Sequence, residues 1–251
     1  MEFVALDPYA PIPPPGQDEL PYDDGEPMES PKHRAQMNLL IETLERRFAG
    51  RRDVYIGGNM ALYYSEHQVR GNDLRAPDFF VVLDAIEDRE RLSWVVWQEN
   101  GRTPDVVIEL LSPSTEREDR GRKMQIYAGL RVSEYFLHDP NTGALEGFRL
   151  EHGAYAPMTL RPDGDFDCKM LGLRLGMATT DHGGLPGSWL RWKLADGTPL
   201  PTGGEEAERE RAAADEARAR AEEAQARADS AEARAHRLAE RLRSLGIDPE
   251  S

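Results

Sequence analysis

The sequence predicts an α/β protein with a mixed β-sheet, followed by a C-terminal Ala-rich heptad helix. The sheet is predicted from a strand–helix–strand order over residues 106–137, because strands joined by a crossover helix pair in parallel. The helix is predicted from an abrupt change of composition near residue 205, after which Ala recurs every seven residues. We expect an acidic Pro-rich arm over 1–31, a domain over 32–204, and a coiled-coil-type helix with a short tail over 205–251.

The formal net charge of the 251 residues is −15, and most of it lies outside the middle of the chain. Residues 1–31 carry −8 and residues 205–251 carry −4, which leaves −3 on residues 32–204. Strong acidity argues against nucleic acid as a partner, since phosphate binding depends on Lys and Arg. The near-balanced middle weakens that argument, and any DNA binding there is expected to be modest and salt-sensitive.

Several protein classes are disfavoured by composition. No stretch approaches the roughly 18–20 uninterrupted apolar residues of a membrane helix, and the N-terminus lacks the basic and apolar regions of a secretory signal. A single cysteine, Cys168, excludes an internal disulfide framework and a zinc site built from several cysteines. We therefore expect a cytoplasmic protein with no membrane partner.

The first elements follow from composition and periodicity. Residues 1–31 are too polar to bury much surface, so they form either a solvated tail or an arm that docks on the domain or on a second subunit. A helix is expected over about 32–49, where Met37, Leu40 and Leu44 share one face.

Short β-type runs follow this helix. The expected strands cover residues 53–56, 60–64, 79–83, 92–97 and 106–111, with Gly57-Gly58 as a turn between the first two. After a break at Ser112-Pro113-Ser114, a helix is expected over about 115–129 and a strand over 134–137. Antiparallel strands are expected over 145–150 and near 155–160, and the Gly-rich residues 161–203 receive no assignment.

The C-terminal helix carries an a/d heptad pattern over more than five heptads. The a positions are Ala207, Ala214, Ala221, Ala228, Ala235 and Leu242, and the d positions are Ala217, Ala224, Ala231, Leu238 and Leu245. A strict period of seven predicts left-handed supercoiling, but Ala buries little apolar area, so association should be weak except near the leucines. The helix is either solvated and alone, or forms a homodimer or binds a partner protein through residues 205–245.

Acidic residues occur where packing alone would not place them. Asp78 begins the run FFVVL, and Asp105 and Glu109 bracket VVI in the next strand. Strand alternation puts Asp105 and Glu109 on one side, and a carboxylate in such a run is costly to bury unless it is paired or binds a cation. Asp78 and Glu109, with a main-chain carbonyl, offer the hard oxygen ligands that suit Mg²⁺ or Mn²⁺.

Lys123 is the candidate cation beside these acids. It lies in the following helix, four residues from Asp119 and four from Tyr127, so the three share one helix face. A lysine there could orient a water or stabilise developing negative charge. In the alternative interpretation, Asp78 caps a loop, Glu109 pairs with Arg120 or Arg122, and Lys123 is solvated.

The strings APDFFVVL and PDVVIELLSPSTEREDRGRKMQIYAGLRVSEYFLHDP resemble the Uma2 family of restriction endonucleases, which is placed in the PD-(D/E)XK nuclease superfamily. DVYIGGNMALYYSE and AERLRSLGIDPE also resemble its members. The resemblance implies a restriction-endonuclease-like core, a central mixed sheet with flanking helices, and an acidic Mg²⁺ site.

By the same resemblance, Asp78 matches the first acid of the motif and Glu109 matches the acid of (D/E)XK. Leu111 stands where the motif has its lysine, so that role passes to Lys123 in the next helix. Asp105, Asp119 and Tyr127 are then supporting residues.

Two functions of different classes follow. The first is a Mg²⁺-dependent endonuclease that hydrolyses DNA phosphodiester bonds, with Asp78, Glu109 and Lys123 as its catalytic residues. The second is a catalytically inactive protein with a nuclease fold that acts through its heptad helix. A metal-dependent hydrolase of another substrate is a third possibility.

Overall fold

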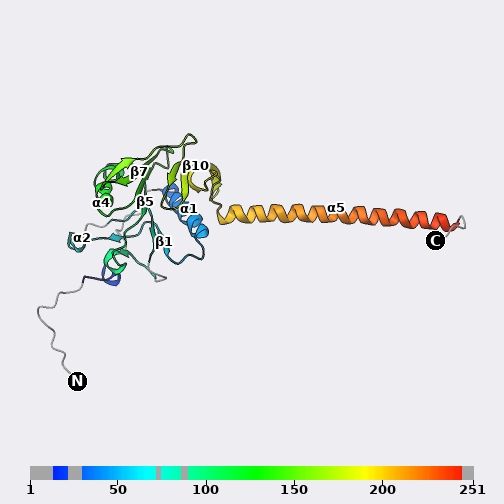
Figure 1. Ribbon diagram of the computed structural model, residues 1–251, viewed down its shortest axis with the longest axis horizontal. Coiled ribbons are helices and arrows are strands. Elements are labelled where there is room, and N and C mark those ends of the chain that lie inside the picture. Colours follow the sequence, from blue (N-terminus) through cyan, green and yellow to red (C-terminus); the bar gives the residue numbers. More distant parts are fainter. Residues whose placement is uncertain (1–13, 22–29, 72–74, 86–89, 245–251) are drawn as a thin grey trace, which may run out of the picture. The chain divides into compact units, whose positions relative to one another are not determined.

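The computed structural model describes residues 14–21, 30–71, 75–85 and 90–244 (Figure 1). The chain divides into two units, Met1–Leu200 and Pro201–Ser251. The first unit contains a mixed β-sheet with helices on both faces, and the second is dominated by one long helix. The predicted fold class, a mixed α/β architecture followed by a C-terminal helix, is confirmed.

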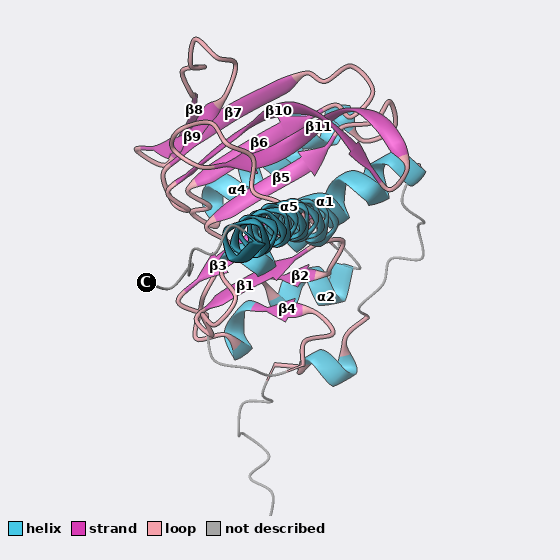
Figure 2. Ribbon diagram, turned by 90° about the vertical axis from the view of Figure 1, so that its right-hand side faces the viewer, coloured by secondary structure: helices cyan, strands magenta, loops and turns pink. Residues whose placement is uncertain are grey.

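The central sheet of the first unit has six strands in the order β1-β3-β5-β6-β7-β8 (Figure 2). Their bounds are β1 (Val54–Gly57), β3 (Phe79–Leu83), β5 (Val106–Leu110), β6 (Glu134–His138), β7 (Leu145–Glu151) and β8 (Ala154–Pro157). Strands β5 and β6 are parallel, as the predicted crossover requires, and the other pairs are antiparallel.

One face of this sheet is covered by helix α1 (Pro31–Arg47) and a second sheet. Ser30 caps α1, since its hydroxyl accepts a hydrogen bond from His33 N at 3.2 Å. Leu40 and Leu44 are buried against the inward side chains of β3 and β5. The second sheet is antiparallel and consists of β9 (Phe166–Cys168), β10 (Leu173–His182) and β11 (Leu185–Lys193).

The opposite face packs against the helical segment that connects β5 to β6. It consists of α3 (Glu116–Glu118), a π-helical turn η3 (Asp119–Lys123) and α4 (Met124–Gly129), in good agreement with the helix expected over 115–129. The π-turn is supported from the sheet, because the Tyr135 hydroxyl donates to the Asp119 carbonyl at 2.9 Å. Tyr127 and Tyr135 are both fully buried in the core of this face.

The chain bends at Gly58-Asn59, directly after β1, close to the turn expected at Gly57-Gly58, but the strands on its two sides do not pair with each other. Strand β1 pairs with β3, whereas β2 (Leu62–Tyr63) pairs in parallel with β4 (Trp94–Val95) in a separate small sheet. A Cβ atom on Gly58 would lie 2.7 Å from the Asp78 carbonyl oxygen and 2.8 Å from Met37 Sδ. The glycine is therefore needed for a close passage between α1 and the start of β3.

Two further segments complete the first unit around β4. The strand expected over 92–97 is limited to β4, because the 3₁₀ helix η2 (Val96–Gln98) follows it directly. The short helix α2 (Glu66–Gly71) follows β2.

Part of the N-terminal arm docks on the domain, which was the second of the two alternatives. The 3₁₀ helix η1 (Gln17–Glu19) lies beside η2, where Gln17 N donates to Gln98 Oε1 at 3.2 Å. Trp97 Nε1 donates to the Pro15 carbonyl at 2.9 Å, and Leu20 is buried with residues of β2 and β4. The rest of the predicted arm, 1–13 and 22–29, lies outside the described residues.

The second unit contains α5 (Gly203–Ser244), a helix of 42 residues. It begins with a capping box, in which Glu205 N donates to Thr202 Oγ1 and Thr202 N donates to Glu205 Oε2. None of its described residues is buried within this chain. Leu245, the last predicted d position, lies outside the described residues. No helix in the described part of the chain is long and apolar enough to cross a membrane.

Candidate active site

The two predicted metal ligands face each other across the β3–β5 strand pair. The register pairs Phe79 with Ile108, which puts Asp78 opposite Glu109. Leu110 N donates to Asp78 Oδ2 at 2.7 Å, and Asp78 N donates to Glu109 Oε2 at 3.3 Å. The main chain at each of these strand ends thus binds the carboxylate that belongs to the other, which fixes both side chains relative to the sheet.

Lys123 reaches this pair from the opposite helix. Its Nζ atom lies 3.2 Å from Glu109 Oε2 and 2.7 Å from Asp119 Oδ1. The Tyr127 hydroxyl donates to the other Glu109 oxygen, Oε1, at 2.8 Å. The structure therefore brings together Asp78, Glu109, Lys123, Asp119 and Tyr127, and we call these five residues the carboxylate cluster.

Two parts of the alternative interpretation are wrong, the solvated Lys123 and the pairing of Glu109 with Arg120. The Lys123 side chain is only 15% exposed and is paired on both sides, so it is not solvated. Arg120, one of the two alternative partners named for Glu109, instead pairs with Glu116 and Glu146 on the surface.

Asp105 does not join the cluster. It precedes β5 and lies four residues before Glu109, a separation of about 13 Å along an extended strand. Its carboxylate accepts a hydrogen bond from Leu83 N at 2.7 Å, at the far end of β3. Strand alternation predicts only the side of the sheet on which Asp105 lies. Among the described residues, no contact between Asp105 and the cluster supports the role that was expected for it.

The cluster has an excess of negative charge in a buried place. Glu109 and Asp119 are fully buried, and the loss of hydration raises the pKa of Glu109 to about 7 and the pKa values of Asp78 and Asp119 to about 6. Lys123 opposes each of these shifts. Burial lowers the pKa of Lys123, but Glu109 and Asp119 outweigh that effect and hold it above its ordinary value.

This arrangement fits a divalent cation. With all three acids ionised, the cluster carries a formal charge of −2, because Lys123 balances only one carboxylate. Carboxylate oxygens are the donors that Mg²⁺ and Mn²⁺ prefer. Within the described residues, no group of three or more His, Cys, Asp or Glu side chains is arranged to hold a metal by itself. The candidate ligands are therefore Asp78 and Glu109, and a carbonyl or water would complete the coordination.

Sequence reasoning missed two contributors. Tyr135 supports the π-turn that carries Asp119 and Lys123, and no local pattern links a strand tyrosine to a helix carbonyl. Glu118, which precedes Asp119 in the chain, pairs with the nearly buried Arg75. The close approach of 75 and 118 depends on the tertiary fold and leaves no signal in the spacing.

Replacing Lys123 by methionine tests the charge balance of the cluster. Lys123→Met should lower the free energy of unfolding by about 3–5 kcal/mol at pH 8 in EDTA, because it strands buried carboxylates. The loss should be smaller at pH 5. A raised carboxyl pKa means that the folded state binds more protons than the unfolded state. Proton binding by these carboxyl groups therefore stabilises the fold at low pH, and this contribution is lost as the pH rises through the folded-state pKa.

Urea unfolding at both pH values measures this effect, and Lys169→Met, at an exposed lysine, is the matched control. A loss for Lys123→Met that equals the control, or that does not change with pH, would contradict the proposed balance of charges.

Comparison with known proteins gives this geometry a context. The chain matches the sequence profile of the Uma2 family, described as “Putative restriction endonuclease”, over residues 6–178. A similar solved structure is that of “a putative nuclease belonging to DUF820” from Anabaena variabilis, with 19% sequence identity and a TM-score of 0.41. That match covers 59% of this chain and 89% of the other. No curated protein matches the chain. Because the family profile spans more than half of the sequence, the chain belongs to the Uma2 family.

Proposed function

We propose that this protein is a Mg²⁺- or Mn²⁺-dependent endonuclease that hydrolyses DNA phosphodiester bonds. The observation that carries the proposal is that the half-buried Asp78 and the buried Glu109 lie opposite each other, with Lys123 Nζ 3.2 Å from Glu109 Oε2. Membership of a family described as a restriction endonuclease supports the choice of substrate. The cluster offers acids for a cation and a lysine for a phosphate, which are the groups that phosphodiester hydrolysis needs.

Each residue of the cluster has a role in this proposal. Asp78 and Glu109 hold the cation, which when bound supplies polarisation of a phosphoryl oxygen and a more acidic water. Lys123 stabilises negative charge that develops at the phosphate or orients the attacking water. Asp119 and Tyr127 are positioning residues, since Asp119 holds the Lys123 ammonium and Tyr127 holds Glu109 Oε1.

Plasmid nicking tests the catalytic proposal. Wild-type protein with Mg²⁺ or Mn²⁺ should convert supercoiled plasmid to open circles, and Glu109→Ala should slow this by about 100-fold or more. Glu151→Ala, which removes an exposed acid from the end of β7, is the control and should nick at the wild-type rate. Equal background rates for wild type and Glu109→Ala would contradict the proposal.

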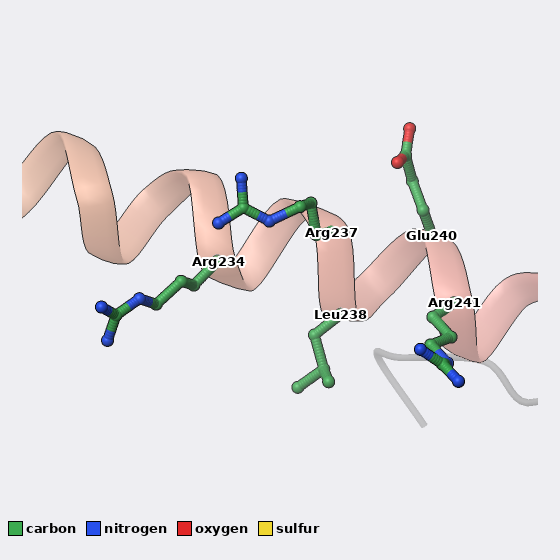
Figure 3. Close-up of a pocket in the computed structure, with 5 residues that line it drawn as sticks. All are labelled: Arg234, Arg237, Leu238, Glu240 and Arg241. Carbon is green, nitrogen blue, oxygen red and sulfur yellow. The ribbon is translucent and has the colours of Figure 1, made fainter.

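The non-enzymatic alternative rests on α5, none of whose described residues is buried within this chain. We infer that α5 forms a homodimer through its a and d positions. Two arginines that precede a positions are paired along the helix, Arg220 with Glu216 and Arg227 with Glu223. Figure 3 shows Arg234, Leu238 and Arg241 on one side of α5, with Glu240 pointing the other way. Leu238 is 64% exposed, so a second copy could bury it.

Two alanine substitutions separate the stripe from the rest of the helix. Ala235→Glu places a charge at an a position and should abolish dimerisation in sedimentation equilibrium of the full chain. Ala233→Glu makes the same chemical change on the outer side of the helix and should leave the dimer intact. A monomeric wild type, or equal effects of the two substitutions, would contradict dimerisation through this stripe.

A further inference from the structure

Two acids of the central sheet lie in one row across three strands. The register pairs Glu109 of β5 with Leu137 of β6, and Leu137 with Glu146 of β7. Side chains paired across neighbouring strands point to the same face of a sheet. Adjacent strands lie about 4.8 Å apart, so Glu109 and Glu146 are separated by roughly 10 Å on one face. The buried Leu137 lies between them.

The π-turn η3 provides one cation for each of these acids. Lys123 Nζ lies 3.2 Å from Glu109 Oε2. Arg120 binds Glu146 through two hydrogen bonds, since Nη1 donates to Oε2 at 2.8 Å and Nη2 donates to Oε1 at 2.6 Å. Arg120 and Lys123 are the second and the last residue of η3. The same short turn is therefore joined to the sheet at two points along one row.

The position of this turn on the sheet decides where its lysine points. π-Helical turns are rare and occur mostly as single turns within α-helices. A shift by one residue in a helix rotates each side chain by about 100° around the axis, which would carry Lys123 away from Glu109. Glu116, the other partner of Arg120, belongs to the same helical segment and cannot fix that segment on the sheet. Glu146 can do so, because it belongs to β7.

We propose that Arg120 is a positioning residue whose ion pair with Glu146 holds η3 in place on the sheet. Held there, the turn keeps the Lys123 ammonium beside Glu109. The proposal rests on the nuclease function proposed above, in which Lys123 acts on the phosphate or the attacking water. Arg120 and Glu146 are 38% and 42% exposed, and exposed ion pairs contribute little to stability. A bidentate pair still imposes a geometry, so its loss should affect the rate more than the fold.

Steady-state nicking of plasmid with Mn²⁺ tests this role. Glu146→Gln keeps the shape of the side chain and removes its charge. It should lower kcat about tenfold, because a displaced Lys123 no longer stabilises charge that develops only in the transition state. KM for plasmid and the melting temperature should stay at their wild-type values. Glu116→Gln makes the same chemical change at the partner outside the sheet, and this matched control should nick at the wild-type rate.

A double-substitution cycle and hydrogen exchange locate the effect. Arg120→Gln should slow nicking as much as Glu146→Gln does, and the two changes together should slow it no further, because all three variants lose one contact. Amide hydrogen exchange over residues 119–124, followed by mass spectrometry, should be faster in Glu146→Gln and unchanged in Glu116→Gln. Additive losses of kcat in the double variant would contradict the proposal.

The outcomes separate this proposal from the nuclease function. If wild type nicks plasmid and Glu146→Gln keeps the wild-type kcat, or Glu116→Gln slows nicking equally, the positioning role is excluded while the nuclease proposal stands. A loss of activity that matches the unfolded fraction of Glu146→Gln marks a purely structural ion pair and also overturns the positioning role. If wild type does not nick plasmid, both proposals fall.

Discussion

The cross-strand exchange between Asp78 and Glu109 is the constraint on which the rest of the first unit depends. Two carboxylates at a strand pair inside the core are costly, so the surrounding structure must supply donors and charge. Main-chain amides of the two strand ends supply one hydrogen bond to each acid. The positive charge and a further hydrogen bond to Glu109 come from the helical segment between β5 and β6, which provides Lys123 and Tyr127.

The need to pair these buried carboxylates also explains the irregular backbone near them. The π-turn brings Asp119 and Lys123 to the cluster, and the Tyr135 hydroxyl binds the carbonyl of that turn. Turns of this kind often occur at functional sites, where an inserted residue redirects side chains. Because Gly58 has no side chain, the chain after β1 can lie close to the Asp78 carbonyl. The π-turn and Gly58 therefore both contribute to the arrangement of the chain around the buried carboxylates.

Much of this could be predicted from the sequence, because the signals are local. The crossover of β5 and β6, helix α1 and the face shared by Asp119, Lys123 and Tyr127 all follow from periodicity. Asp105 shows the limit of that reasoning, since alternation gives the side of a strand and not the distance along it. The β9–β11 sheet was missed because only the first part of β10 is buried, so its alternation is broken. Pairs such as Arg75 and Glu118 depend on the tertiary fold and leave no trace in spacing.

The central claim is that Asp78 and Glu109 together bind a divalent cation, and calorimetric titration of Mn²⁺ into the full-length protein tests it most directly. The account predicts one Mn²⁺ bound per chain by wild type, and loss of that binding in Glu109→Gln and in Asp78→Asn while both variants remain folded. Asp105→Asn, which changes an acid just before β5 and outside the cluster, should bind like wild type. Absence of Mn²⁺ binding by wild type, or equal binding by all four proteins, would contradict the claim.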